Sequence, residues 1–336
     1  MEDGILSAIG NTPLVKLSRL CKDYGFQVFA KLEALNPGGS MKDRPAYNII
    51  RHALETGAVD SDTVVIESSS GNMGIGLAQA CAYYELRFVC VVDVKTTQQN
   101  LRVLKAYGAE VHVVSEPDPE TGEFLPARIN HVKALAEATP KSFWVNQYAN
   151  EQNALAHHQT MREIVNALDG RVDYLFCATS TCGTLRGCRE YVTAHHVESK
   201  IYGVDAVGSV VFGGERSKRL LPGHGSAFRP ELFRSGLVDE FIHVTDTECV
   251  VGCRRLARHE AILAGGSSGG IFMALERVRH QLEPGANCAL IFPDRGDRYL
   301  DTIYSDAWVS SHFGDISHLW TGRGGAEPRR PAASTA

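Results

Sequence analysis

Short apolar runs alternate along the chain with segments whose apolar residues recur at helical spacing. Runs rich in β-branched and aromatic residues predict strands at 28–32, 63–67, 87–94, 110–114, 143–147, 172–178, 200–207 and 288–293. Helical spacing predicts helices at 74–84, 100–108, 151–168 and 249–263. The strands are apolar nearly throughout, which favours parallel sheets covered by helices on both faces. In such an α/β fold, ligands bind at the carboxyl ends of the strands.

Composition narrows the class of protein. The 336 residues are 44% hydrophobic and 22% charged, and this length favours two domains over one. The formal charge of −5 is spread without a basic patch, which argues against nucleic-acid or membrane partners and favours small substrates. No leader or membrane-spanning apolar run is visible, and the nine cysteines fall largely in apolar runs, as buried free thiols do. We therefore predict a cytoplasmic protein, with a disordered tail over the Gly- and Pro-rich residues 321–336.

One lysine stands in an unusual place. Lys42 follows the turn-forming run "NPGGS" and precedes a predicted helix. A lysine on a solvated helix needs no such turn, whereas an amine that must meet a small ligand at a fixed angle does. The alternative from the residues alone is a surface lysine paired with Asp43 or Glu33.

Three further loops combine small and hydroxyl residues before a helix. Residues 68–72, "SSSGN", follow a predicted strand, and residues 180–184, "STCGT", follow another. Residues 265–270, "GGSSGG", form the third loop, which we also expect to follow a strand. Such loops can bind an anion at a helix N-terminus, although helix capping or a tight turn explains each one equally well in isolation. The glycine order G-x-x-G-x-G after residue 70 does not fit a dinucleotide site, and no Gly-Lys-Ser/Thr ending marks a P-loop.

A prepared lysine, a phosphate cradle and a hydroxyl-rich anion loop are together the parts of a pyridoxal phosphate site. The motifs "GNTPLVKL", "NPGGSMKDR", "SSSGNMGIGLA", "STCGT", "GGSSGG" and "PDRGDRYL" resemble, in this order, the cysteine synthase and cystathionine β-synthase family over residues 4–310. The resemblance implies a fold-type II enzyme with two three-layer α/β/α domains and the cofactor in the cleft between them. It places the large domain at 1–40 and 150–320 and the small domain at 41–149. It also implies a homodimer, and no metal ligands.

The resemblance assigns roles to individual residues. It implies that Lys42 links covalently to the cofactor and acts as general base once freed. It implies that Asn72 contacts the phenolic oxygen and that Ser267 faces the pyridine nitrogen. Further residues follow by the same match: the phosphate group would be held by Ser180, Thr181, Cys182, Gly183 and Thr184, and the substrate by Ser69, Ser70, Met73, Arg128, Tyr148 and Ser180. Cys182 has no histidine near it in sequence, so we interpret it as pocket wall and not as a nucleophile.

The substrate is suggested by departures from the cysteine synthases. Met73 stands where they carry a threonine, and hydroxyl residues replace glycines in the cradle. The phrases "AKLEALNPGGSMKDRPA", "NQYANE", "AVGSVVFG" and "FPDRGDRYLD" most resemble synthases that join O-phospho-L-serine to L-glutamate, giving N-(2-amino-2-carboxyethyl)-L-glutamate for 2,3-diaminopropionate in siderophore or antibiotic biosynthesis. Two alternatives remain: an ordinary cysteine or cystathionine synthase, and a binding subunit that has lost catalysis. Retention of Lys42 and the ligand loops speaks against the second.

Overall fold

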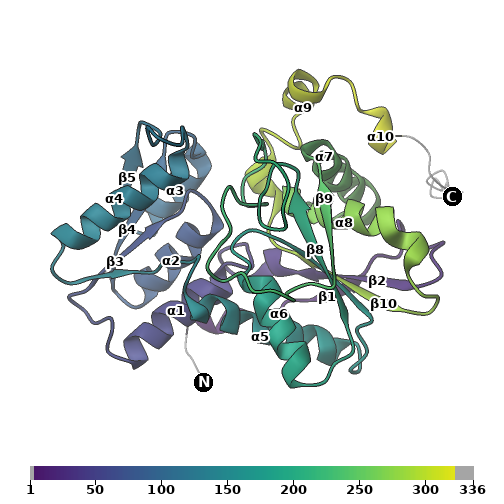
Figure 1. Ribbon diagram of the computed structural model, residues 1–336, viewed down its shortest axis with the longest axis horizontal. Coiled ribbons are helices and arrows are strands. Elements are labelled where there is room, and N and C mark those ends of the chain that lie inside the picture. The colour runs from purple at the N-terminus through teal and green to yellow at the C-terminus, as the bar shows by residue number, and fades with distance from the viewer. Residues whose placement is uncertain (1–3, 322–336) are drawn as a thin grey trace, which may run out of the picture.

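Residues 4–321, the part of the chain that the computed structural model describes, form two parallel-stranded sheets that lie side by side (Figure 1). The larger sheet has the order β1-β2-β10-β7-β8-β9, and its strands span Leu14–Lys16, Gln27–Leu32, Asn287–Phe292, Tyr174–Ala178, Lys200–Ala206 and Glu240–Val244. The smaller sheet has the order β5-β4-β3-β6, with strands Glu110–Val114, Arg87–Asp93, Val64–Ser68 and Ser142–Trp144. Every pairing is parallel except that of β1 with β2.

Helices cover both faces of the larger sheet (Figure 1). One face packs against α7 (Asp246–Arg255) and α8 (Gly266–Val278), and its core contains Phe176, Phe272 and Phe292. The other face packs against α5 (Glu151–Ala167) and α6 (Gly183–Ala194), with a core that includes Ile164, Leu185 and Ile291. The strands are apolar throughout because both of their faces are buried.

The smaller sheet is layered in the same way. Helix α4 (Phe124–Ala138) packs on one face, where Val132 lies among strand valines. Helices α1 (Asp43–Glu55), α2 (Asn72–Tyr83) and α3 (Gln98–Ala106) lie on the other. The remaining short elements are η1 (Ile5–Ala8), η2 (Glu33–Leu35), η3 (Leu256–Glu260), η4 (Arg279–Gln281), η5 (Gly296–Tyr299), α9 (Asp306–Phe313) and α10 (His318–Thr321).

The structure confirms the α/β class, the eight predicted strands and the four predicted helices, with some changes at their ends. Strands β1 and β9 were not predicted. The helix predicted at 249–263 begins earlier, at Asp246, because Thr245 and Glu248 form a reciprocal cap at its start. It ends in the wider turns of η3. The domain boundaries remain a prediction, and the predicted tail lies outside the described residues apart from Thr321, which closes α10.

Two features bear on the surroundings of the protein. All nine cysteines are buried and none forms a disulfide, as the apolar runs predicted. Among the helices of residues 4–321, none has the length and apolar character needed to cross a bilayer.

Candidate active site

The turn before Lys42 and two of the hydroxyl-rich loops lie at the carboxyl ends of strands from both sheets. The turn before Lys42 follows β2 and η2, the "SSSGN" loop follows β3, and the "STCGT" loop follows β7. Parallel strands place all of these loops on one edge of their sheet. The third loop was expected to follow a strand, and this is wrong: residues 261–265 follow the helical turns of η3 and lead into α8.

The turn before Lys42 is held by its own polar groups. Asn36 donates to the carboxylate of Glu33 at 2.9 Å, and the Gly39 N–H donates to the Asn36 carbonyl at 2.8 Å. Gly39 has φ of +85°, a conformation that favours glycine. Gly38 N–H donates to Asp43 Oδ2 at 2.5 Å. This closed turn fixes where the first turn of α1, and Lys42 just before it, begins.

Lys42 does not behave as a solvated surface lysine. Its ammonium makes no hydrogen bond or ion pair with any residue in the described range, whereas Asp43 and Glu33 are bound to Gly38 and Arg44. The alternative pairing of Lys42 with either carboxylate is therefore wrong. Lys42 keeps some exposed surface, yet the surrounding protein desolvates its amine and lowers the pKa to about 8 from its ordinary 10.5. Near physiological pH roughly a tenth to a fifth of this amine is then neutral, against about a thousandth for an ordinary lysine, and the neutral form is the nucleophile.

This pKa predicts how the apoprotein takes up an aldehyde. We expect the rate of covalent capture by Lys42 to rise with pH through about 8 and then level off, because only the neutral amine attacks a carbonyl. The measurement is the growth of visible absorbance after pyridoxal phosphate is added at a series of pH values. N-acetyl-lysine amide, whose amine is fully solvated, is the control and should still be gaining rate at about pH 10. A protein profile that follows the control would contradict a desolvated Lys42.

The "STCGT" loop fits a phosphate group. Thr181 and Thr184 are buried at the start of α6, where the first N–H groups have no partner within the helix. Asn153 donates to Thr181 Oγ1 at 3.3 Å, and a Cβ at Gly183 would collide with the same amide. Both hydroxyls lie beside the N-terminus of α6, after the end of β7: Thr181 Oγ1 also accepts from Gly183 N–H at 3.3 Å, and Thr184 Oγ1 lies 3.3 Å from His157 Nε2. Ser180, partly buried, precedes them.

Cys182 lies directly before α6, in the "STCGT" loop. It adopts φ of +65° and packs in an apolar cluster with Val211, Leu232 and Leu237. Burial raises the pKa of its thiol to about 12, so the thiolate needed for a nucleophile is absent at neutral pH. This supports the interpretation of Cys182 as pocket wall.

Some residues predicted around the "SSSGN" loop are partly exposed, and others are buried. Ser69 Oγ accepts from Gly74 N–H at 2.9 Å and caps α2, while Ser70 and Asn72 are partly exposed. Met73 lies in the apolar core under the loop with 2% exposure, and its contact with the substrate remains a prediction. Ser267, predicted at the pyridine nitrogen, is buried in the first turn of α8.

Arg128 and Tyr148 lie in one electrostatic cluster. Arg128 is buried on α4, and its Nε lies 3.3 Å from Asp93 Oδ2 at the end of β4, where the two form an ion pair without an aligned hydrogen bond. Its Nη1 has no hydrogen-bond partner in residues 4–321. Burial raises the pKa of Tyr148, and Arg128, Glu67 and Arg219 lie close enough to act on it. The cluster therefore offers unsatisfied donors beside a tyrosine hydroxyl.

Glu67 and Arg219 are members of this cluster that sequence reasoning missed. Burial raises the pKa of Glu67 to about 7, against hydrogen bonds from the Ser68 and Gln147 N–H groups. Arg219 has a buried nitrogen without a partner in the described chain, and burial lowers its pKa. An acid that closes an apolar strand was a usable signal for Glu67. Arg219 lies in an irregular loop between β8 and β9, where periodicity gives no signal.

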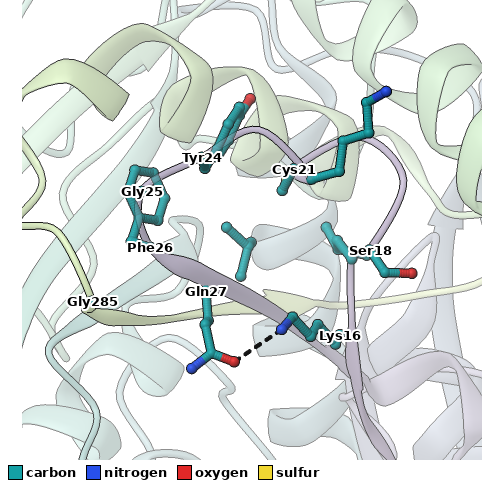
Figure 2. A pocket seen from close by; sticks show the side chains of 11 residues that line it. Lys16, Ser18, Cys21, Tyr24, Gly25, Phe26, Gln27 and Gly285 are labelled. Carbon is teal, nitrogen blue, oxygen red and sulfur yellow. Dashed lines mark hydrogen bonds between the residues drawn. The ribbon is translucent and has the colours of Figure 1, made fainter. Parts of the chain in front are cut away.

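A hollow of about 330 Å³ lies elsewhere (Figure 2). Its lining includes Gly25, Phe26 and Gln27, at the amino end of β2, whereas Lys42 follows the carboxyl end of that strand. Figure 2 shows Lys16 donating to Gln27 across its rim, at 3.0 Å. The hollow is thus separate from the predicted catalytic residues.

Comparison with known proteins now decides the family. Residues 5–294 match the family described as pyridoxal-phosphate-dependent enzymes. The chain belongs to this family. This pyridoxal-phosphate-dependent enzyme has the fold of an O-acetylserine-dependent cystathionine β-synthase from Helicobacter pylori, with 33% identity, a TM-score of 0.84 and coverage of 91% of this chain and 99% of the other.

Other solved structures agree. A hydrogen sulfide-producing enzyme from Fusobacterium nucleatum is 31% identical over 89% of this chain and 100% of its own, with a TM-score of 0.83. An O-acetylserine sulfhydrylase isoform from Entamoeba histolytica is 30% identical over 90% and 92%, with a TM-score of 0.84. The enzyme is thus of fold-type II, in the cysteine synthase and cystathionine β-synthase group, as its motifs predicted.

The residues present fit the cofactor that the family requires. Lys42 supplies an amine without a partner, the start of α6 supplies N–H and hydroxyl donors, and Thr179 Oγ1 is a buried hydroxyl without a partner in residues 4–321 at the base of that loop. A phosphate group needs such a donor set, and an aldehyde needs such an amine. The individual roles of these residues remain a prediction.

Proposed function

We propose that this enzyme replaces the phosphate of O-phospho-L-serine with the amine of L-glutamate, forming N-(2-amino-2-carboxyethyl)-L-glutamate and inorganic phosphate. When bound, pyridoxal phosphate supplies the electron sink that lets a substrate lose its α-proton and β-substituent. The product would serve as a precursor of 2,3-diaminopropionate for siderophore or antibiotic biosynthesis. We also propose that the enzyme acts as a homodimer.

The observation that carries the proposal is the buried Arg128. A guanidinium in the interior is normally fully hydrogen-bonded, because each unsatisfied donor costs about 1–3 kcal/mol. Arg128 keeps Nη1 without a hydrogen bond in residues 4–321, while its charge is balanced by Asp93, whose Oδ2 lies 3.3 Å from Nε. Sulfide needs no such anchor, whereas each carboxylate of glutamate must be paired when it leaves water. Arg128, Tyr148 and Ser180 are the donors that we assign to the anionic substrates.

Lys42 is the group that we assign to proton transfer. Its pKa of about 8 suits a base that works near neutral pH, since general bases are most effective when their pKa lies near the operating pH. Ser69 and Ser70, with the backbone near Asn72, would hold the substrate's α-carboxylate at the start of α2. The dipole of α2 favours a negative charge there.

The principal alternative is thiol or thioether synthesis. The similar structures bear names that refer to O-acetylserine, hydrogen sulfide or cystathionine, which favours this chemistry. An O-ureido-L-serine synthase, 28% identical over 92% of this chain, is named for a product whose β-carbon bears oxygen and not sulfur, so products other than thiols and thioethers also occur on the fold. The alternative predicts rapid product with sulfide and none with glutamate.

The test uses the cofactor-loaded enzyme with O-phosphoserine and either L-glutamate or sulfide, followed by mass spectrometry of the products. We expect a carbon–nitrogen coupled product and one phosphate per turnover with glutamate. Thiol product alone would overturn the proposal in favour of the alternative.

Arg128→Met should lower kcat/KM for glutamate coupling by roughly 10- to 100-fold, the equivalent of one lost hydrogen bond to a charged group. The cofactor should stay bound, as its visible absorbance reports. Arg87→Met is the matched control, because Arg87 is exposed at the start of β4 in the same sheet. Unchanged coupling by Arg128→Met would remove this residue from the substrate site.

A further inference from the structure

We propose that Arg298 and Asp294 are positioning residues that fix the orientation of the Asn72 side-chain amide. Asn72 begins α2, whereas Asp294 and Arg298 follow β10 in the other sheet. The inference rests on the proposed contact of Asn72 with the cofactor's phenolic oxygen. It adds two residues that bind neither cofactor nor substrate and act through Asn72.

The hydrogen bonds of Asn72 leave one orientation of its amide. Asn72 Nδ2 donates to Asp294 Oδ2 at 2.8 Å, and Arg298 Nη1 donates to Asn72 Oδ1. A carboxylate can only accept and a guanidinium can only donate. Rotating the amide by half a turn would place its oxygen against Asp294 and its N–H groups against Arg298. Both contacts would become repulsive, so the two charges together select the observed orientation.

Asp294 is itself held in place. It is 2% exposed, and Oδ2 also accepts from the Tyr299 hydroxyl at 2.7 Å. Its carbonyl accepts from Gly265 N–H at 3.1 Å, and a Cβ at Gly265 would collide with the Asp294 carboxylate. The carboxylate therefore cannot turn to follow a rotated Asn72.

Arg298 joins Asn72 to the turn that precedes Lys42. Its Nη2 donates to the Gly38 carbonyl. The same segment makes backbone contacts with that turn, since Met41 N–H donates to Pro293 O at 2.8 Å and Ser40 pairs with Asp294. One short segment after β10 thus fixes the places of both Asn72 and Lys42.

The orientation has a consequence for the bound cofactor. One Nδ2 hydrogen is used by Asp294, and the second is the donor that remains for a phenolic oxygen. This donor stabilises the deprotonated oxygen, whereas the oxygen of a rotated amide would favour its protonated form. The deprotonated form absorbs in the visible and the protonated form in the near ultraviolet. The ratio of these bands therefore reports the orientation of Asn72.

The experiment compares wild type, Arg298→Met and Arg298→Lys, each loaded with pyridoxal phosphate and without substrate. We expect the visible-to-ultraviolet ratio to fall at least about twofold in Arg298→Met, and cofactor affinity to fall roughly tenfold. Arg298→Lys should restore much of both. Arg295→Met is the matched control from the same segment, because Arg295 is exposed and pairs with Asp297.

The double variant Arg298→Met with Asn72→Ala tests whether Arg298 acts through Asn72. We expect Asn72→Ala to shift the ratio and the second substitution to add no further shift. If Arg298→Met weakens binding or lowers the unfolding temperature while the ratio stays at the wild-type value, the role of Arg298 is merely structural and the inference is wrong. Additive shifts would also overturn it.

These readouts need no substrate, so they are independent of whether glutamate is the nucleophile. An unchanged ratio in Asn72→Ala would refute the proposed cofactor contact of Asn72. A shift in Asn72→Ala without one in Arg298→Met would refute the positioning role alone.

Discussion

Lys42→Ala should abolish the visible absorbance of the purified enzyme and lower its turnover about ten-thousand-fold, the upper range for loss of a general base. The reason is that no other lysine in residues 4–321 combines burial with a free amine. Lys31 is the alternative that burial offers, but its amine already donates to the Thr12 carbonyl at 2.5 Å and to Glu163 at 2.6 Å. An exposed lysine has no fixed angle to a cofactor phosphate held at α6.

The link itself can be located by borohydride reduction followed by peptide mass mapping. We expect the reduced cofactor on the peptide that contains Lys42, and no attachment in Lys42→Ala. Lys105→Ala on the exposed side of α3 is the control and should keep full absorbance. Attachment at a different lysine in the wild-type enzyme would show that the turn before Lys42 serves another purpose.

The parts of the site that the sequence predicted are local. The "STCGT" and "SSSGN" loops were found because a buried apolar strand ends just before hydroxyl and glycine residues, and a helix begins just after them. The turn before Lys42 was found for a similar reason. Each of these signals lies within about ten residues of sequence, the range over which strand ends, turns and helix caps are encoded.

The strands and site residues that the sequence did not predict depend on contacts between segments that are distant in sequence, or on elements too short to show a period. Strand β1 has three residues, too few to show a period, and β9 has an exposed Phe241 because it lies at the sheet edge. Met73 resembles a substrate contact by position, and the burial of its side chain in the core at the first turn of α2 was not predicted. Glu67 could be noticed as an acid at the end of an apolar strand, but Arg219 reaches it near Tyr148 only after both sheets have formed, so no local pattern indicates that the two lie together.

The contact of Asp294 and Arg298 with Asn72 shows the same limit. The motif "PDRGDRYL" contributed to the family resemblance, but more than two hundred residues separate it from Asn72. Asp294 and Arg298 can orient the Asn72 amide only once the fold has brought them beside it. A motif can therefore identify a family before the action of its residues is known.

The second large effect, on stability, is expected at a buried cluster of four charged side chains close in sequence and structure to the start of α1. Arg44 on α1 donates to Glu33 at 2.7 Å and to Glu163 on α5 at 2.7 and 2.8 Å. Lys31 on β2 donates to Glu163 at 2.6 Å. Two acids and two bases are thus balanced with little exposure to water. The cluster joins the strand before the Lys42 turn to α1 and α5.

Removing one partner of such a cluster leaves a buried charge unpaired. We expect Arg44→Met to lower the free energy of unfolding by about 3–5 kcal/mol, the range measured for broken buried pairs. Cofactor affinity should fall as well, because Arg44 anchors the first turn of α1, which directly follows Lys42. Chemical denaturation of the cofactor-free protein gives the first quantity. Arg162→Met, on the exposed face of α5, is the control and should change stability by less than about 0.5 kcal/mol.

The pH dependence separates loss of charge pairing from loss of packing. Burial opposes ionisation of Glu163, but hydrogen bonds from Arg44 and Lys31 outweigh it and hold its pKa at about 2, below the ordinary value of 4.5. A depressed carboxyl pKa contributes stability above the ordinary value, and this contribution is lost as pH falls toward about 2. In Arg44→Met the pairing weakens, the pKa of Glu163 rises, and the difference in stability from wild type should shrink progressively below about pH 4.5. A difference that stays constant from pH 7 to the acid limit would show that Arg44 stabilises the fold through packing and not through its charge.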